Sequence, residues 1–181
     1  MRKIAFLDRD GVLNKEVNYL YKIDDYSLIE NCLKALMNLK NLGFEFVIIT
    51  NQAGIAKGIF TEEQYFKLTD FYLKEFQKYE IEFLEVLYCP NHPDAKIEKY
   101  KKDCLFRKPN PGMINKIIEM YDVDIDNSIL VGDKIIDIQC GINAGIKKNF
   151  FVESGHKISE SDRKHFKIYK NLYSVSLSLM D

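Results

Sequence analysis

The chain has 181 residues, of which 26 are basic and 27 acidic, so its formal net charge is −1. This balance argues against a protein that holds nucleic acid or a membrane surface by bulk electrostatic attraction. Hydrophobic residues make up 46% of the chain and charged residues 29%, which excludes an intrinsically disordered chain. The length predicts a single domain over residues 1–181 that can fold without disulfides.

The N-terminus gives no sign of export or membrane insertion. Met1-Arg2-Lys3 runs directly into Ile4-Ala5-Phe6-Leu7, an apolar run far too short for the core of a signal peptide. No apolar run reaches the ~18 residues that a membrane-spanning helix needs. We therefore expect a cytoplasmic protein with no membrane partner and no nucleic-acid partner.

Strand-like and helix-like segments alternate along the chain. Residues 45–50 form a nearly continuous β-branched run, typical of a parallel strand buried on both faces. Residues 31–42 place apolar side chains at helical spacing and end at Gly43, and Thr61-Glu62-Glu63-Gln64 matches a capping box that opens a helix. In chain order we expect strands at residues 3–7, 45–50, 81–88, 128–131, 149–152 and 167–169, helices at 31–42, 61–79, 111–121 and 135–144, and a closing turn or helix at 174–180.

This alternation predicts an α/β fold with a doubly wound parallel sheet and helices on both faces, in three layers. Ligands of such folds bind beyond the carboxyl ends of the strands. Asp8 follows the first expected strand, Thr50-Asn51-Gln52 the second and Gly132-Asp133 the fourth. We therefore expect these polar residues to converge at one edge of the sheet.

Asp8-Arg9-Asp10-Gly11 is the strongest of these signals. Two carboxylates two residues apart can share one cation, and Gly11 allows a sharp turn. An ordinary charged turn uses the same residue types. However, two acids and an arginine directly after a buried strand are costly unless something binds them.

Asp133 and Asp137 follow the fourth expected strand. Asp133 would join Asp8 around a cation, and carboxylate and carbonyl oxygens suit Mg²⁺. Asp133 could instead cap the following helix. Asp137, one turn into that helix, either supports the metal site or faces solvent.

Thr50 and Lys108 offer groups that bind phosphate. Thr50 supplies a hydroxyl, and the backbone amides of Asn51 and Gln52 before a helix suit phosphate oxygens. Lys108 supplies a positive charge. Neither residue carries weight alone, and their order along the chain is the informative feature.

That order resembles the haloacid dehalogenase superfamily of phosphotransferases, over essentially the whole chain. The matching motifs are Asp8-x-Asp10-Gly11, Thr50, Lys108, and Gly132-Asp133 with Asp137. The resemblance implies that Asp8 is a nucleophile forming an aspartyl-phosphate, and that Asp10 protonates the leaving oxygen and then activates water. It also implies that Thr50 and Lys108 hold the phosphoryl oxygens. Mg²⁺ would be bound by Asp8, the Asp10 carbonyl and Asp133.

Longer stretches resemble one family within this superfamily, the D-glycero-D-manno-heptose-1,7-bisphosphate 7-phosphatases, with the histidinol-phosphate phosphatases as close relatives. These stretches cover residues 8–14, 50–58, 89–93, 107–113 and 131–134. Such enzymes have almost no cap domain, in keeping with the length of this chain. The resemblance implies that substrate contacts Glu16, Val17, Asn18, Tyr19, Asn51, Gln52, Ala53, Arg107 and Lys134. Arg107 would meet the second, C1 phosphate, which a guanidinium fork suits.

One part of the family pattern is broken. The family usually holds a structural zinc between a Cys-x-His and a Cys-x-Cys motif. This chain keeps Cys89 and Cys104, but Asn91 and Phe106 stand at the other two ligand positions, with His92 as a candidate substitute ligand. Because structural zinc takes four protein ligands, we do not expect zinc, and we expect Phe106 to fill the metal's volume.

The resemblance implies a Mg²⁺-dependent phosphatase that removes the 7-phosphate of a heptose 1,7-bisphosphate in nucleotide-activated heptose biosynthesis, for lipopolysaccharide or related glycans. We expect a monomer acting on this small sugar phosphate. A histidinol-phosphate phosphatase is the alternative, less favoured because the chain has no room for the dehydratase domain often fused to it. A non-catalytic phosphate-binding protein agrees less well with the retention of every catalytic motif residue. His156 and His165, in the polar tail, are expected at the surface.

Overall fold

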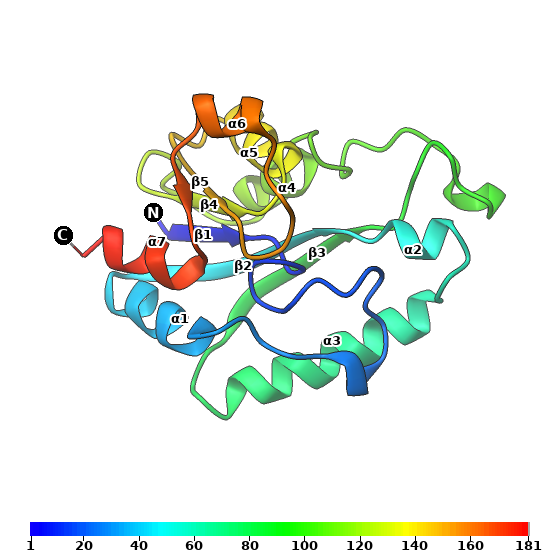
Figure 1. Cartoon of the computed structure of the whole chain (residues 1–181), viewed down its shortest axis with the longest axis horizontal. Helices are drawn as coiled ribbons and strands as arrows, with labels where there is room; N and C mark the ends of the chain where they lie inside the picture. Colours follow the sequence, from blue (N-terminus) through cyan, green and yellow to red (C-terminus); the bar gives the residue numbers. More distant parts are fainter. Residues whose placement is uncertain (181) are drawn as a thin grey trace.

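The computed structural model, shown in Figure 1, describes residues 1–180. Its centre is a six-stranded sheet in the order β3-β2-β1-β4-β5-β6, and every neighbouring pair is parallel. The strands are β1 (Lys3–Leu7), β2 (Phe44–Asn51), β3 (Phe83–Cys89), β4 (Ile129–Gly132), β5 (Lys148–Val152) and β6 (Ile168–Tyr169). The doubly wound parallel sheet is thereby confirmed.

Helices cover both faces of the sheet, as Figure 1 shows. The helices are α1 (Cys32–Asn41), α2 (Ala53–Ala56), α3 (Glu62–Gln77), α4 (Gly112–Met120), α5 (Ile135–Asn143), α6 (Glu160–His165) and α7 (Leu172–Ser178), with single 3-10 turns at Ile23–Asp25 and Glu98–Tyr100. Within residues 1–180, no helix is long and apolar enough to cross a membrane.

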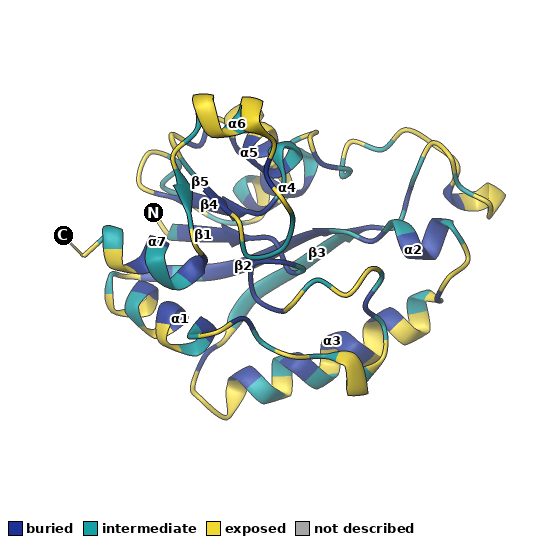
Figure 2. Ribbon diagram, viewed as in Figure 1, coloured by how far each residue is buried: buried dark blue, intermediate teal, exposed yellow. Residues whose placement is uncertain are grey.

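Strand β1 shows why the sequences of the central strands are continuous apolar runs. Ala5 and Leu7 point into one hydrophobic cluster, whereas Ile4 and Phe6 point into another on the opposite face. All four side chains are fully buried. In Figure 2 the inner strands β1, β2 and β4 are mainly dark blue, β3 is largely teal, and the outer faces of the helices are exposed. A strand buried on both sides carries apolar residues at every position rather than alternating ones.

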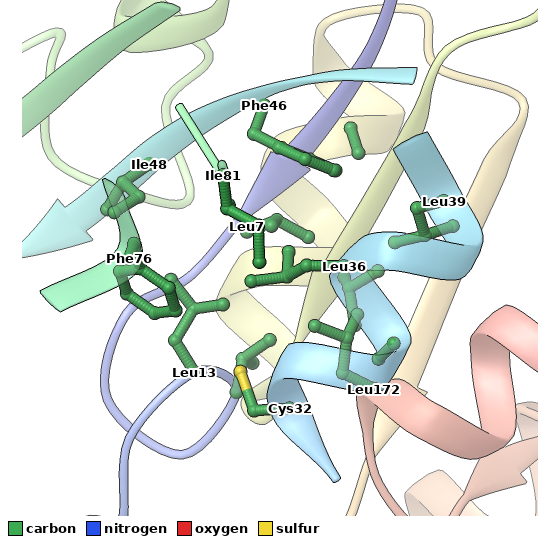
Figure 3. Packing of buried hydrophobic residues seen from close by; sticks show 14 of the residues in the cluster. Leu7, Leu13, Cys32, Leu36, Leu39, Phe46, Ile48, Phe76, Ile81 and Leu172 are labelled. Atoms are coloured by element: carbon green, nitrogen blue, oxygen red, sulfur yellow. The ribbon is translucent and has the colours of Figure 1, made fainter. Parts of the chain in front are cut away.

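The larger cluster lies between the sheet and helices α1, α3 and α7. Figure 3 shows Leu36 of α1, Phe76 of α3 and Leu172 of α7 gathered around Leu7. Burying one side chain of this size contributes about 1.5–3 kcal/mol. On the other face, Met113, Ile114 and Ile117 of α4 pack with α5 against the sheet. The two clusters therefore hold the strand ends in place from both sides.

Helix α3 begins where the capping box predicts. Thr61 Oγ1 accepts a hydrogen bond from the Gln64 amide at 3.2 Å, and Gln64 Oε1 accepts one from the Thr61 amide at 2.9 Å. The expected helices α1, α4 and α5 and the expected strands agree with the structure within about two residues at each end. Helices α2 and α6 were not predicted, because four and six residues are too few to show a periodic pattern.

The carboxyl edge of the sheet is left open. Between β1 and α1 the chain adds a loop with one 3-10 turn, and in the described residues it adds no larger insertion there. A third, smaller cluster around Ile55, Phe60, Tyr65 and Tyr100 fastens α2 to the loop that follows β3. This edge is therefore flanked by loops rather than covered by a cap domain.

Candidate active site

Three strand ends and one loop bring polar side chains to the open edge. Asp8 directly follows β1, Thr50 lies near the end of β2, and Asp133 directly follows β4. Because β1 lies between β2 and β4 in the sheet, these residues become neighbours. Lys108, from the loop between β3 and α4, lines the same pocket as Asp8 and Thr50.

Lys108 is buried between two carboxylates, with 2% of its surface exposed. Its Nζ lies 2.8 Å from Asp8 Oδ1 and 2.7 Å from Asp137 Oδ1, and it donates a hydrogen bond to the Ile49 carbonyl at 2.9 Å. Asp8 Oδ1 also accepts a bond from the Arg9 amide at 2.9 Å. Asp137 is therefore a buried partner of Lys108, not a solvent-facing acid.

Burial raises the pKa of Asp8 to about 6, and the charge of Lys108 opposes that rise. For Lys108, burial by itself lowers the pKa, but the carboxylates of Asp137 and Asp8 outweigh it and raise the pKa above its ordinary value. Lys108 thus stays charged at neutral pH, beside an acid that ionises near neutral pH.

Asp10 is held by several donors. Arg9 donates to its carboxylate from Nε and Nη2 at 2.8–3.1 Å, Asn14 Nδ2 at 2.9 Å and Gln52 Nε2 at 3.1 Å. Burial alone would raise the pKa of Asp10, but the Arg9 charge and these hydrogen bonds lower it below its usual range. Asp10 is therefore an ionised carboxylate in the unliganded protein.

Asn51 and Gln52 orient the groups around them. Asn51 Nδ2 donates to the Lys108 carbonyl and Asn51 Oδ1 accepts from the Lys108 amide, both at 3.1 Å. Gln52 Nε2 donates to Thr50 Oγ1 at 2.8 Å as well as to Asp10. These two side chains therefore couple the β2 end to Lys108 and to Asp10.

An acidic cluster lies beside the nucleophile candidate. Ligand atoms of Asp8, Asp133 and Asp137 all lie within 4.8 Å of one another, and all three residues are buried. Burial, with the charges of Asp8 and Asp137, raises the pKa of Asp133 to about 9. Lys108 pairs with Asp8 and Asp137, whereas Asp133 keeps its proton at neutral pH in the absence of a cation.

His156 was expected at the surface, and its side chain is indeed 39% exposed, but its contact with the acidic cluster was not predicted. Its Nδ1 lies 2.5 Å from Asp133 Oδ2, and its Nε2 lies 3.9 Å from Glu16 Oε2. Burial and the charge of Lys134 lower the pKa of His156, so the ring is mostly neutral at neutral pH. The turn after β5 places the ring at the edge of the sheet. The sequence of the tail did not predict this position. His165, by contrast, is exposed, as expected.

Basic side chains that follow β2 and β3 also line the pocket, and we call this part its basic end. Lys57 Nζ donates to the Tyr19 hydroxyl at 2.7 Å, and Arg107 Nη1 donates to the Asn91 carbonyl at 3.1 Å. Burial, followed by the charges of Arg107 and Lys57, lowers the pKa of His92. Lys57 was not among the predicted contacts, although the motif at residues 50–58 contains it between two glycines.

Most of the predicted substrate residues line this one pocket. They are Glu16, Asn18, Tyr19, Asn51, Gln52, Ala53, Arg107 and Lys134. Val17 is 43% exposed and does not line it. The backbone is left-handed at the next two residues, Asn18 (φ 53°) and Tyr19 (φ 72°).

The sequence of this chain is similar to those of known phosphatases. A family model described as polynucleotide kinase 3 phosphatase matches residues 3–172. A Photorhabdus laumondii protein named D-glycero-alpha-D-manno-heptose-1,7-bisphosphate 7-phosphatase is 47% identical over 174 residues, which are 96% of this chain and 94% of that protein. The chain belongs to the heptose-bisphosphate phosphatase family of the haloacid dehalogenase superfamily.

Further relatives of this family are similar over most of the chain. A Haemophilus influenzae protein named for the beta anomer of the same bisphosphate is 40% identical over 159 residues, covering 88% of this chain and 86% of its own. The crystal structure of a D,D-heptose 1,7-bisphosphate phosphatase from B. bronchiseptica, complexed with magnesium and phosphate, matches with a TM-score of 0.81. It is 27% identical, and the match covers 98% of each chain.

The acidic cluster fits the magnesium that this family implies. Asp133 Oδ1 is buried and has no hydrogen-bond partner within residues 1–180. Such an oxygen is costly to bury unless a cation or donor meets it. Asp8 and Asp137 supply further hard oxygen atoms at ligand spacing, which is the donor set that Mg²⁺ takes.

The loop after β3 does not fit zinc. Asn91, at a ligand position, is buried and its Nδ2 donates to the Tyr100 carbonyl at 3.3 Å. His92 Nδ1 accepts from the Asp94 amide at 3.0 Å. Burial, with Cys104 adding to it, raises the pKa of Cys89 to about 12, so Cys89 is a thiol in the metal-free protein.

Phe106, at the other replaced position, packs against the hydrophobic cluster of α4 and α5. Within residues 1–180, the cysteines of this loop are not among groups of three or more side chains that could hold a metal. His92 as a substitute zinc ligand is therefore not supported by the geometry. The loop is held by hydrogen bonds and by this aromatic contact instead.

Proposed function

We propose that this protein is a Mg²⁺-dependent phosphatase that removes the 7-phosphate of a D-glycero-D-manno-heptose 1,7-bisphosphate, in the synthesis of nucleotide-activated heptose. The observation that carries the proposal is Asp8, a buried carboxylate fixed by Lys108 and adjoining the acidic cluster. The names of the relatives at 47% and 40% identity supply the substrate class.

Asp8 is the proposed nucleophile. Its Oδ1 is held by the Arg9 amide and by Lys108, which leaves Oδ2 to attack phosphorus as the bond to the leaving sugar oxygen breaks. Lys108 and the Thr50 hydroxyl face the pocket and are placed to bind phosphoryl oxygens. Asp8, the Asp10 carbonyl and Asp133 would hold Mg²⁺, which would supply positive charge to offset the negative charge of the phosphoryl group.

Asp10 is the proposed general acid and general base. It is ionised before substrate binds. The negative charge of the arriving phosphate raises the pKa of Asp10, which takes a proton from solvent water and then gives it to the leaving oxygen. The ionised Asp10 next takes a proton from water while the water oxygen attacks the aspartyl-phosphate. Phosphate leaves and Asp8 is restored.

The basic end of the pocket is proposed to bind the second phosphate. Lys57 and Arg107 contact a hydroxyl and a carbonyl, so their positive charges are available to an anion. A guanidinium and an ammonium together suit a phosphate dianion.

Because every group assigned a role comes from one chain, we propose that the enzyme acts as a monomer with one folded domain.

We propose the alpha anomer as the preferred substrate. The relative at 47% identity is named for that anomer, while relatives at 36–40% identity are named for the beta anomer.

Phosphate release from both anomers of the heptose bisphosphate and from histidinol phosphate, with and without Mg²⁺, tests the proposal. We expect the alpha anomer to be turned over fastest and all turnover to require Mg²⁺. Faster turnover of histidinol phosphate would favour the alternative in histidine synthesis. Absence of phosphate release from every substrate would favour a non-catalytic phosphate-binding protein.

A further inference from the structure

His156 lies where it can control one oxygen of the acidic cluster. Its Nδ1 is 2.5 Å from Asp133 Oδ2, and its side chain is 39% exposed. A carboxylate must be ionised to bind a cation, and an ionised Oδ2 accepts hydrogen bonds, so in the metal-bound state Nδ1 carries the proton and donates. This bond commits Oδ2 to the protein and leaves Oδ1, buried and without a partner within residues 1–180, as the oxygen that faces a cation.

Glycine backbones enclose the same carboxylate on two further sides. A Cβ built on Gly11 would lie 2.3 Å from Asp133 Oδ2, and one built on Gly155 would lie 2.1 Å from it. Ser154 Oγ donates to the Gly11 carbonyl at 2.6 Å, which ties the loop after β5 to the loop after β1. The backbone therefore limits where the carboxylate can go, and the imidazole supplies the donor that sets its rotation.

His156 also faces the loop that carries the predicted substrate contacts. Its Nε2 lies 3.9 Å from Glu16 Oε2, and Lys134 Nζ lies 4.0 Å from the same oxygen. These separations are too long for direct hydrogen bonds. The short contact with Asp133 is therefore the one through which the ring acts.

We propose that His156 is a positioning residue, which orients Asp133 so that Oδ1 is presented to the divalent cation. The inference rests on the magnesium site of the proposed function, not on the identity of the sugar. Hydrogen bonds to ligating carboxylates are commonly needed for full metal affinity, and removing such a partner typically costs about 10–100-fold in affinity.

Three variants separate this role from alternatives. His156→Phe keeps a ring but removes the donor. His156→Asn places an amide N–H at the position of Nδ1 and should restore the bond. His165→Phe is the matched control, because His165 is an exposed histidine of the same tail whose Nδ1 contacts only the Ser161 carbonyl.

Mn²⁺ binding is measured by electron paramagnetic resonance without substrate, alongside the Mg²⁺ concentration that gives half-maximal phosphate release. We expect His156→Phe to weaken Mn²⁺ binding about 10-fold or more, and His156→Asn to recover most of it. The half-maximal Mg²⁺ concentration should rise in parallel, by more than the KM for the sugar phosphate. Thermal unfolding of each variant shows that it is folded.

Wild-type Mn²⁺ affinity in His156→Phe would overturn the inference, and so would equal losses in the Phe and Asn variants. A rise confined to the substrate KM would identify the ring as a substrate contact instead. Because Mn²⁺ binding needs no substrate, His156-dependent binding in a protein that does not hydrolyse the heptose bisphosphate would refute the proposed substrate while leaving this inference standing.

Discussion

The acidic cluster, which we call the acidic end of the site, and the basic end of the pocket are held by different parts of the fold. Asp8, Asp133 and Asp137 lie at strand ends or in the first turn of α5, and all three are buried. Lys57 and Arg107 come from loops after β2 and β3 and are only partly buried. The acidic end, which packed strands and α5 position, is desolvated, and we call it the rigid end. The basic end, which loops position, is partly solvated, and we call it the loop end.

Burial determines whether the charges at each end need a counter-charge. Buried acids close together repel one another in a medium that screens poorly, so Asp133 ionises only at high pH, and a bound cation would stabilise its ionised form. The basic end keeps contact with water and needs no partner to be stable. We infer that the rigid end carries the chemistry and that the loops select which sugar phosphate binds.

The largest expected effect is at the rigid end. Asp8→Asn keeps the size of the side chain but removes the nucleophilic charge, so we expect phosphate release to fall about 1,000-fold or more. The rate of phosphate release at saturating Mg²⁺ measures it. Asp70→Asn, which changes an exposed acid of α3, is the matched control. Full activity in Asp8→Asn would exclude the covalent mechanism.

The next effect tests the loop end. Arg107→Ala removes the guanidinium proposed to hold the second phosphate, so we expect kcat/KM for the bisphosphate to fall about 10–100-fold relative to a heptose 7-monophosphate. Arg163→Ala, at an exposed arginine that pairs with Glu153, is the control. Equal losses for both substrates would show that Arg107 does not recognise the second phosphate.

Removing one repelling charge should stabilise the metal-free protein. The pKa of Asp133 is raised to about 9 in the folded state, so the stability it contributes is present below about pH 4 and is lost as the pH rises toward 9. At pH 8 we therefore expect Asp133→Asn to raise the metal-free Tm by several degrees. Mg²⁺ should raise the Tm of the wild type but not of the variant.

Calorimetry in chelator and in Mg²⁺ measures both effects. Asp126→Asn, at an exposed acid paired with Lys147, is the control and should change the Tm little. A lower metal-free Tm in Asp133→Asn would show that repulsion does not dominate at the acidic end.

The smallest effect concerns the loop after β3. Asn91→Ala removes a buried amide that bonds the Tyr100 carbonyl, which we expect to cost about 1–3 kcal/mol of unfolding free energy. Denaturant unfolding measures it, with exposed Asn127→Ala as a control. Metal analysis of the purified protein should find zinc well below one per chain, and stoichiometric zinc would contradict a loop held without metal.

Much of the fold followed from local patterns. The apolar runs of β1 and β2 predicted buried parallel strands, and the Thr61 capping box predicted the start of α3. The rule that ligands bind at strand ends then predicted that Asp8, Thr50 and Asp133 would meet. Helix α2 was missed because four residues cannot show periodicity.

Local patterns were less informative for side chains whose neighbours lie far along the chain. Asp137 could have faced solvent, until the loop after β3 was seen to bring Lys108 against it. His156 lies in a polar tail that suggests a surface, and Lys57 lies in a short loop with no strong pattern. The role of each of these side chains depends on a contact with a residue of another element.

The local sequence determines the strands, their alternation with helices and the residues at their ends, because periodicity and turn chemistry act over a few residues. The roles of Asp137, His156 and Lys57 were decided only when the chain folded. Burial and electrostatics depend on distance in space, and a contact such as His156 with Asp133, 23 residues apart, exists only at the assembled sheet edge.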